Sequence, residues 1–163
     1  MDLLEVNNLH VRLQTQRGPA EAVRGVSFSL ARGETLGLIG ESGCGKSITA
    51  MSLMGLLPES AQVSGSIRFD GEELVGQSDA ALCRIRGDRI GMIFQEPSTS
   101  LNPVMRIGDQ IVEAIEAHTP LRGEAARAKA LDWLRKVGIP EPERRIDDYP
   151  FRMSGGQKQR VMI

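Results

Sequence analysis

Residues 40–47 read Gly40-Glu41-Ser42-Gly43-Cys44-Gly45-Lys46-Ser47 and fit the pattern G-x-x-x-x-G-K-[ST] at every fixed position. The apolar run 35–39 before them predicts a short strand covered on both faces. Residues 47–57 after them carry apolar side chains at helical spacing, so a helix is expected there. A strand, a glycine-rich loop and a helix in this order are typical of a phosphate-binding loop. The stretch therefore predicts an α/β fold that binds a nucleotide.

The chemistry of this loop depends on three kinds of group. Its glycines allow backbone N–H groups to point at phosphate oxygens, and the following helix adds its positive N-terminal end. Lys46 would reach the β- and γ-phosphates, and the Ser47 hydroxyl would ligate Mg²⁺. The simpler interpretation, a glycine-rich turn beside a surface lysine, leaves the fit of both flanks unexplained. The loop alone indicates only a nucleotide, and kinases, GTPases, helicases and transport ATPases remain open.

A second glycine motif, Ser154-Gly155-Gly156-Gln157, opens another helix-like run. Its backbone amides, hydroxyl and side-chain amide are suited to an anion. One domain has no evident use for a second phosphate site so far along the chain. Two copies that face each other head to tail would have a use for such a second site.

With both motifs in place, the sequence resembles the ATP-binding subunit of an ABC transporter: a phosphate loop, then Gln95 at a strand end, then the Ser-Gly-Gly-Gln signature. Further stretches are similar to the branch that imports oligopeptides, dipeptides and nickel. They are residues 40–43 (GESG), 92–97 (MIFQEP) with 100–103 (SLNP), and 159–163 (QRVMI). The resemblance extends over residues 3–163.

The resemblance implies a role for each motif residue. ATP with Mg²⁺ would be held by the loop and the start of its helix, namely Gly40, Glu41, Ser42, Gly43, Cys44, Gly45, Lys46, Ser47 and Ile48. Ser47 and Gln95 would contact the Mg²⁺, and Gln95 would also position the attacking water. The signature residues Ser154, Gly155, Gly156 and Gln157 would close over ATP bound by the partner subunit. Leu13 stands where the family often has an aromatic ring against adenine, and it offers packing without a π-face.

The resemblance also implies the fold and its division. The fold would be α/β, a P-loop NTPase fold of ABC ATPase type, with an N-terminal antiparallel β subdomain and an inserted helical subdomain. Residues 1–78 would form the β subdomain with the phosphate-loop core, residues 79–152 the helical subdomain, and residues 153–163 the signature with the start of its helix. The local pattern agrees, because it predicts strands at 3–6, 9–13, 22–30, 66–71 and 89–94, and helices after Pro103.

By the same resemblance, the chain would power import of peptides or related small solutes across the bacterial inner membrane. It would act at the cytoplasmic face of that membrane as half of an ATPase dimer, with an identical or related second ATPase subunit. Two membrane-spanning permease subunits would bind the helical subdomain, and an external solute-binding protein would act through them. These residues do not determine the transported solute.

The family's remaining catalytic motifs follow the signature: an Asp that helps hold Mg²⁺, the adjacent catalytic Glu and a later His. None of them can be placed in residues 1–163, so the C-terminal part of the core is expected to be missing. The chain is therefore expected to bind Mg-ATP without hydrolysing it alone, and to expose apolar strand edges. The alternative is a non-catalytic nucleotide-binding fragment or truncated subunit.

Composition excludes several other classes of protein. The 163 residues carry 20 Lys+Arg and 21 Asp+Glu, a net charge of −1, without the basic excess that coating nucleic acid or an anionic membrane requires. No apolar run is long enough to span a bilayer, and the acidic N-terminus has no secretory signal pattern. Cys44 and Cys83 are far apart, which suits a reducing cytosol. No nucleic-acid partner is expected.

Two rival nucleotide-binding classes explain less. A small kinase or GTPase would leave the signature and Gln95 as coincidences. An ABC-type ATPase that works on DNA would need heptads between Gln95 and Ser154, or CxxC pairs, and the sequence has neither.

Several residues outside the motifs have simple interpretations. Cys44, beside Lys46 at a helix start, is a candidate redox-sensitive thiol, but a small neutral spacer is the simpler role. Asp147-Asp148 is expected to be a solvated turn, and Trp133 is expected to pack. Arg160 is expected to be surface charge, although it follows the signature closely enough to help position its helix.

Overall fold

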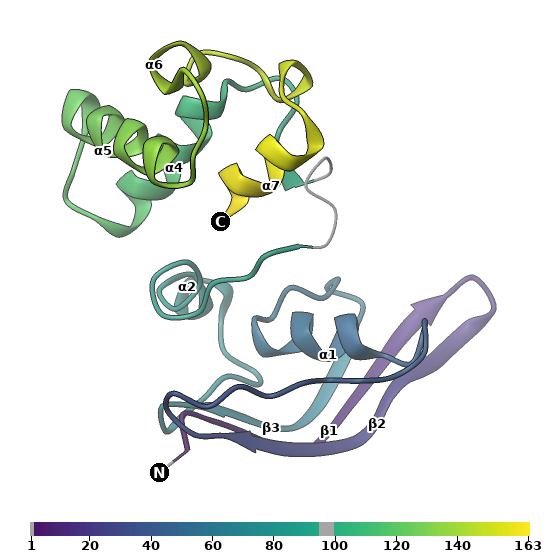
Figure 1. Cartoon of the computed structure of the whole chain (residues 1–163). Coiled ribbons are helices and arrows are strands. Elements are labelled where there is room, and N and C mark those ends of the chain that lie inside the picture. Colours follow the sequence, from purple (N-terminus) through teal and green to yellow (C-terminus); the bar gives the residue numbers. More distant parts are fainter. Residues whose placement is uncertain (1, 95–99) are drawn as a thin grey trace. The chain divides into compact units, whose positions relative to one another are not determined.

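A computed structural model of the chain describes residues 2–94 and 100–163. It divides into two compact units, Met1–Arg86 and Gly87–Ile163 (Figure 1). The first unit contains the phosphate-loop sequence and the second contains the signature sequence. The three-part division expected from the resemblance stays a prediction.

The first unit is built on an antiparallel sheet. Its strands are β1 (Leu4–Thr15), β2 (Gly18–Leu30), β3 (Gln62–Phe69) and β4 (Glu72–Glu73), in the order β2-β1-β3-β4. β1 is one continuous strand where the sequence predicts two runs, because the ladder absorbs Asn7 and Asn8 as a register shift, with Asn8 at φ 48°. The long β1–β2 hairpin is therefore the main structural element of this unit.

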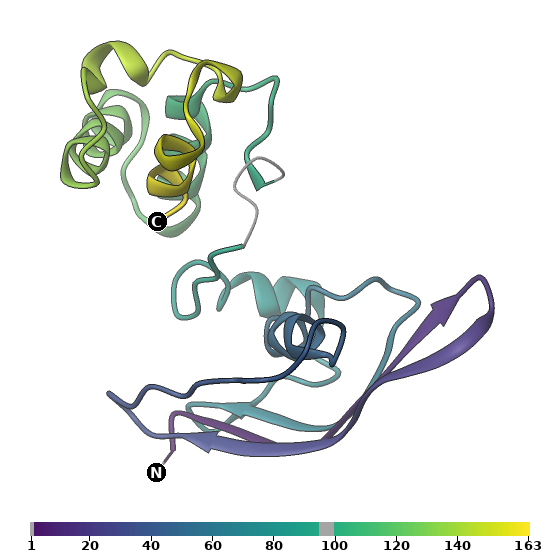
Figure 2. The same ribbon diagram turned by 45° about the vertical axis from the view of Figure 1, so that its right-hand side comes forward.

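Helix α1 (Lys46–Leu53) packs on one face of this sheet, as both views show (Figures 1 and 2). The side chains beneath it are buried and apolar, and they include Val6, Leu9, Val11 and Ile67. The helix ends at Leu53, earlier than the periodicity predicts, because Gly55 takes φ 59° and the Leu56 N–H donates to the Met51 carbonyl at 2.9 Å.

A short second helix, α2 (Asp79–Cys83), follows in the same unit, and the Ser78 hydroxyl caps it by accepting from the Ala81 N–H. Arg86 joins this helix to the end of α1. Its guanidinium donates to the carbonyls of Met54 and Gly55, each at 2.7 Å, and to the Asp79 carboxylate at 2.8 Å. These bonds satisfy carbonyls that the end of α1 leaves free.

Two predicted strands, 35–39 and 89–94, are wrong as local assignments. Both segments run without a strand ladder in the described residues, and Ile39 and Ile93 are 96% and 63% exposed. A central parallel strand is stabilised by hydrogen bonds to a strand on each side and by cover on both faces. Within residues 2–94 and 100–163, every strand ladder is antiparallel and belongs to the β1–β4 sheet, and Ile90 takes part only in an isolated bridge. Apolar composition alone therefore does not produce the ladder.

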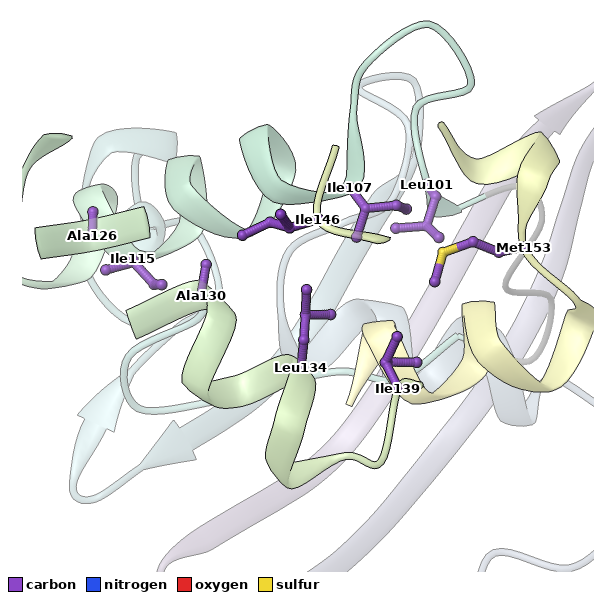
Figure 3. Packing of buried hydrophobic residues seen from close by; sticks show 9 residues of the cluster. All are labelled: Leu101, Ile107, Ile115, Ala126, Ala130, Leu134, Ile139, Ile146 and Met153. Atoms are coloured by element: carbon purple, nitrogen blue, oxygen red, sulfur yellow. The ribbon is translucent and has the colours of Figure 1, made fainter. Parts of the chain in front are cut away.

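The second unit is helical. Its elements are α4 (Ile107–His118), α5 (Gly123–Lys136), α6 (Pro142–Arg145), the 3₁₀ turn η1 (Pro150–Arg152) and α7 (Gly155–Met162). Their apolar stripes meet in one core, shown in Figure 3, which comprises Leu101, Ile107, Ile115, Ala126, Ala130, Leu134, Ile139, Ile146 and Met153.

The loop after α6 binds the start of α4. The N–H of Ile107 donates to the Asp148 carbonyl at 2.9 Å, and the N–H of Gly108 donates to the Ile146 carbonyl at 2.8 Å. A Cβ at Gly108 would lie 2.7 Å from that same carbonyl oxygen. The close approach is possible because residue 108 has no side chain.

None of the helices in residues 2–94 and 100–163 is long and apolar enough to cross a bilayer.

Leu134 lies in the middle of the helical core with 1% of its surface exposed. We expect Leu134→Ala to lower the free energy of unfolding by about 2–5 kcal/mol, because it removes buried methyl groups and leaves a cavity. Urea unfolding followed by Trp133 fluorescence measures this unit directly, since Trp133 is the single tryptophan and lies on α5. Val104→Ala is the control, because Val104 is 78% exposed; an equal loss in both variants would contradict the assigned core.

Candidate functional site

The phosphate-loop sequence makes a tight turn directly before α1. Gly43 and Gly45 have φ of 83° and 96°, which side-chain-bearing residues rarely adopt. A Cβ at Gly45 would lie 2.7 Å from the carbonyl oxygen of Ala22 on β2. Gly45 therefore lets the loop pass against the hairpin and lets α1 begin at the next residue.

Lys46 folds back over its own loop. Its ammonium donates to the carbonyls of Gly40 at 2.6 Å and Glu41 at 2.7 Å, and to the Cys44 sulfur at 3.4 Å. Three donors on one ammonium thereby hold the two ends of the loop together. The arrangement concentrates a positive charge on the inner side of the turn.

The start of α1 presents backbone amides without acceptors in the helix. The first bond of the helix runs from the Thr49 N–H to the Gly45 carbonyl at 2.8 Å, so the amides of Lys46, Ser47 and Ile48 precede the ladder. No side chain caps this end, and its first turn holds no acidic residue. Free amides, the helix dipole and the Lys46 ammonium together favour an anion here.

A cavity of about 570 Å³ lies beside the loop. Its walls come from the β2 segment 21–24 with Val26, from the loop and α1, and from Leu38 and Ile39. Its lining combines apolar side chains with the charged residues Glu21, Arg24 and Lys46, which suits a ligand with both a charged and an apolar part. Of the other predicted residues in this unit, Ser47 is exposed and Ile48 half-buried on α1.

The predicted adenine contact lies apart from this cavity. Leu13 pairs with Ala20 near the turn of the β1–β2 hairpin, is half-buried, and is not among the described residues that line the cavity. Its contact with a base stays a prediction. Gln95 lies outside the described residues, so its role also stays a prediction.

The signature sequence forms the N-terminus of α7 in the second unit. Ser154 and Gln157 bond reciprocally: the Gln157 N–H donates to the Ser154 hydroxyl at 3.3 Å, and the Ser154 N–H donates to the Gln157 side-chain oxygen at 2.9 Å. This capping box leaves Gly155 and Gly156 exposed, and a Cβ at either would meet no atom within 4 Å among the described residues. Both glycines are therefore open to a partner.

Sequence reasoning missed the environment of Asp148. Asp148 is buried instead of solvated, and its carboxylate binds Arg145 at 3.0 Å and Arg152 at 3.5 Å. Arg145 also donates to the Arg152 carbonyl at 3.4 Å, so the two arginines and Asp148 hold the turn η1 that leads into Ser154. Adjacency in the sequence gave no signal for this, because only the folded loop turns Asp148 inward.

Trp133 lies on the surface of α5. It is 46% exposed, and the ammonium groups of Lys129 and Lys136 lie 5.1 and 4.6 Å from its ring centroid. The ring shields the helix surface through cation–π contacts.

Gly45 and Gly43 offer a matched test of the loop. We expect Gly45→Ala to raise the hydrogen-exchange rate of the Thr49 amide more than Gly43→Ala does. Both variants carry the strain of a left-handed backbone, about 1–2 kcal/mol, but only at Gly45 would the new Cβ meet the hairpin backbone. NMR measures the exchange rate of the Thr49 amide in both variants. Equal rates in the two would show that the contact with Ala22 does not hold the loop.

The adjacent residues Asp147 and Asp148 form a second matched pair. Asp148→Ala should lower the free energy of unfolding of the helical unit by roughly 3 kcal/mol, because it leaves partly buried Arg145 without its counter-ion. Asp147→Ala should cost less than about 1 kcal/mol, since the pairs of Asp147 with Arg127 and Arg106 are solvent-exposed. Urea titration followed by Trp133 fluorescence compares them, and a reversed order would refute the assignment.

Comparison with known proteins identifies relatives of this chain. The family model described as ABC transporter matches residues 23–163. The chain is 51% identical over 162 residues to the oligopeptide transport ATP-binding protein OppD of Mycobacterium tuberculosis, covering 99% of this chain and 26% of that protein. It is 50% identical over 163 residues to the dipeptide transport ATP-binding protein DppD of Bacillus subtilis, covering 99% and 49%. The chain thus spans about half or less of the length of these relatives.

Solved structures agree on the fold. A dimeric ATP-binding cassette bound to ADP and Pi in a post-hydrolysis state matches with a TM-score of 0.81 at 25% identity, over 98% of this chain and 66% of that one. A dimeric bacterial ABC transporter cassette matches with a TM-score of 0.81 at 26% identity, over 98% and 67%. The predicted fold of ABC ATPase type is therefore confirmed, and the chain belongs to the ABC transporter family as part of its ATP-binding cassette.

Proposed function

We propose that this chain belongs to the ATP-binding component that powers import of peptides or related small solutes. The observation that carries the proposal is the turn before α1, where the helix starts without a side-chain cap and its first residue, Lys46, lines a cavity of about 570 Å³. The peptide-import names of relatives that are 50–51% identical support the choice of solute class.

The residues of the loop fit the triphosphate of ATP. The amides of Lys46, Ser47 and Ile48 have no intrahelical acceptor, and a phosphate oxygen would supply one. Lys46 would exchange part of its bonding to the loop carbonyls for the β- and γ-phosphates. Gly43 lies at the cavity wall, where its missing side chain lets the backbone approach the ligand.

Mg²⁺ would be held by the Ser47 hydroxyl and by Gln95. The Ser47 side chain is exposed at the first turn of α1, next to the amides that would bind phosphate. When bound, the ion would neutralise charge on the β- and γ-phosphates. Ser47 would hold the ion on the phosphate side, while Gln95 would orient the attacking water.

The signature implies a second ATPase subunit, identical or related. Ser154, Gly155, Gly156 and Gln157 would close over the γ-phosphate of ATP held by that partner, since the open glycine amides at the start of α7 are suited to an anion. The helical unit would dock on two permease subunits at the cytoplasmic face of the bacterial inner membrane, and an external solute-binding protein would deliver the solute to those subunits.

Residues 1–163 differ in what they offer to ATP binding and to ATP hydrolysis. These residues hold the proposed phosphate contacts but no match to the family's catalytic Glu or its adjacent Asp. We expect them to bind Mg-ATP without sustained turnover by themselves. A chain that only binds nucleotide, as a non-catalytic fragment or truncated subunit, is the alternative to the import ATPase.

Lys46→Ala tests the proposal. It should weaken ATP binding by about 10- to 100-fold, the value of a charge-assisted hydrogen bond to phosphate. Titration calorimetry of the 163-residue chain with Mg-ATP measures the affinity, and Lys129→Ala serves as the control because Lys129 lies on α5 in the other unit.

Two results would contradict the proposal in different ways. Equal affinity of Lys46→Ala and the unchanged chain would remove the loop as the nucleotide site. Sustained phosphate release that Lys46→Ala abolishes would show that residues 1–163 do hydrolyse ATP, against the expected separation.

A further inference from the structure

Arg160 on α7 links two helices through one guanidinium. Its Nε donates to the carbonyl of Gly156 at 3.3 Å, inside the signature itself. Its Nη1 donates to the carbonyl of Val137 at 3.4 Å and also to that of Gly138. Gly156 and the 137–138 pair belong to different elements, so the side chain ties the signature helix to the end of α5.

The end of α5 is suited to receive this cation. α5 ends at Lys136, and Gly138 turns the chain away with φ 70°. The last carbonyls of a helix lack intrahelical donors and carry the negative end of its dipole. Arg160 donates to the carbonyls of the C-cap residue Val137 and of Gly138 at this negative end, and its planar fork allows Nε and Nη1 to donate in two directions at once.

The signature is thereby held from both sides. Before it, Met153 is buried in the helical core, and the Asp148 ion pairs hold the turn η1. After it, Val161 and Met162 pack against the same core, and Arg160 binds α5. Between these anchors the glycines at 155 and 156 are exposed.

We propose that Arg160 is a positioning residue that sets the direction in which the exposed signature amides of Gly155 and Gly156 point, by joining α7 to the carbonyls of Val137 and Gly138 directly after α5. The inference rests on the proposed function only for its consequence, that correctly directed amides are needed to engage ATP on a partner subunit. The positioning itself depends on contacts within one unit.

Three variants separate positioning from charge and from general stability. Arg160→Met keeps the aliphatic stem and removes every donor. Arg160→Lys keeps the charge, but a single ammonium cannot reproduce the two-directional fork. Lys158→Met is the matched control on the same helix, because the Lys158 side chain makes no hydrogen bond or ion pair with the described residues.

Hydrogen exchange of the backbone amides in the 163-residue chain is the direct readout. Exchange in α7 should become at least about tenfold faster in Arg160→Met, in line with the loss of charge-assisted hydrogen bonds. It should be intermediate in Arg160→Lys and unchanged in Lys158→Met, while the amides of α4 keep their rates in all three. Unchanged α7 exchange in Arg160→Met would overturn the proposal, and so would full protection in Arg160→Lys, which would reduce the role to charge alone.

The functional consequence has its own readout. With Mg-ATP, Arg160→Met should bind nucleotide like the unchanged chain but form the ATP-dependent dimer at least about tenfold less well, measured by analytical ultracentrifugation. Dimerisation equal to that of the unchanged chain would overturn the consequence. If the unchanged chain binds no ATP, the proposed function fails, while the exchange result still decides whether Arg160 positions α7.

Discussion

The contact between Gly45 and the Ala22 carbonyl is the constraint on which the first unit depends. A Cβ at residue 45 would lie 2.7 Å from that oxygen, so the loop can cross the hairpin only with glycine at this position. Directly after this crossing α1 begins, and its first residue, Lys46, lines the cavity beside β2. Lys46 is the first residue of the helix, and from there its ammonium reaches back to the Gly40 and Glu41 carbonyls.

The two candidate anion-binding helix ends use opposite arrangements. α1 has no side-chain cap, and a lysine holds its loop. α7 has a complete capping box from Ser154 and Gln157, and its orientation is maintained by Arg160 and by the ion pairs of the buried Asp148 with Arg145 and Arg152. The first end has amides left free for a ligand, whereas the second has a rigid, exposed pair of glycines. This difference is consistent with one site that encloses a phosphate and another that closes on it from a second subunit.

Much of the site was predictable because its chemistry is local. The eight-residue pattern at 40–47, the helix behind it and the cap at Ser154 all arise from residues close together in the chain. The strands predicted at 35–39 and 89–94 were wrong, because a ladder requires neighbouring strands that apolar composition does not supply. Asp148 was misjudged for the same reason, since its burial depends on Arg145, Arg152 and the start of α4 meeting around one loop.

The sequence by itself determined the family, because a phosphate-loop pattern at 40–47 is followed by the Ser-Gly-Gly-Gln signature at 154–157, and it predicted a nucleotide as the ligand from the loop pattern. Only the tertiary structure decided which groups are held and which are free. It folded Lys46 onto its own loop, turned Asp148 inward and joined Arg160 to the end of α5. Arg160 contacts residues far away in the chain, whereas Lys46 and Asp148 bond to near neighbours that only the folded loops bring within reach, and a pattern of residue types carries no information about either geometry.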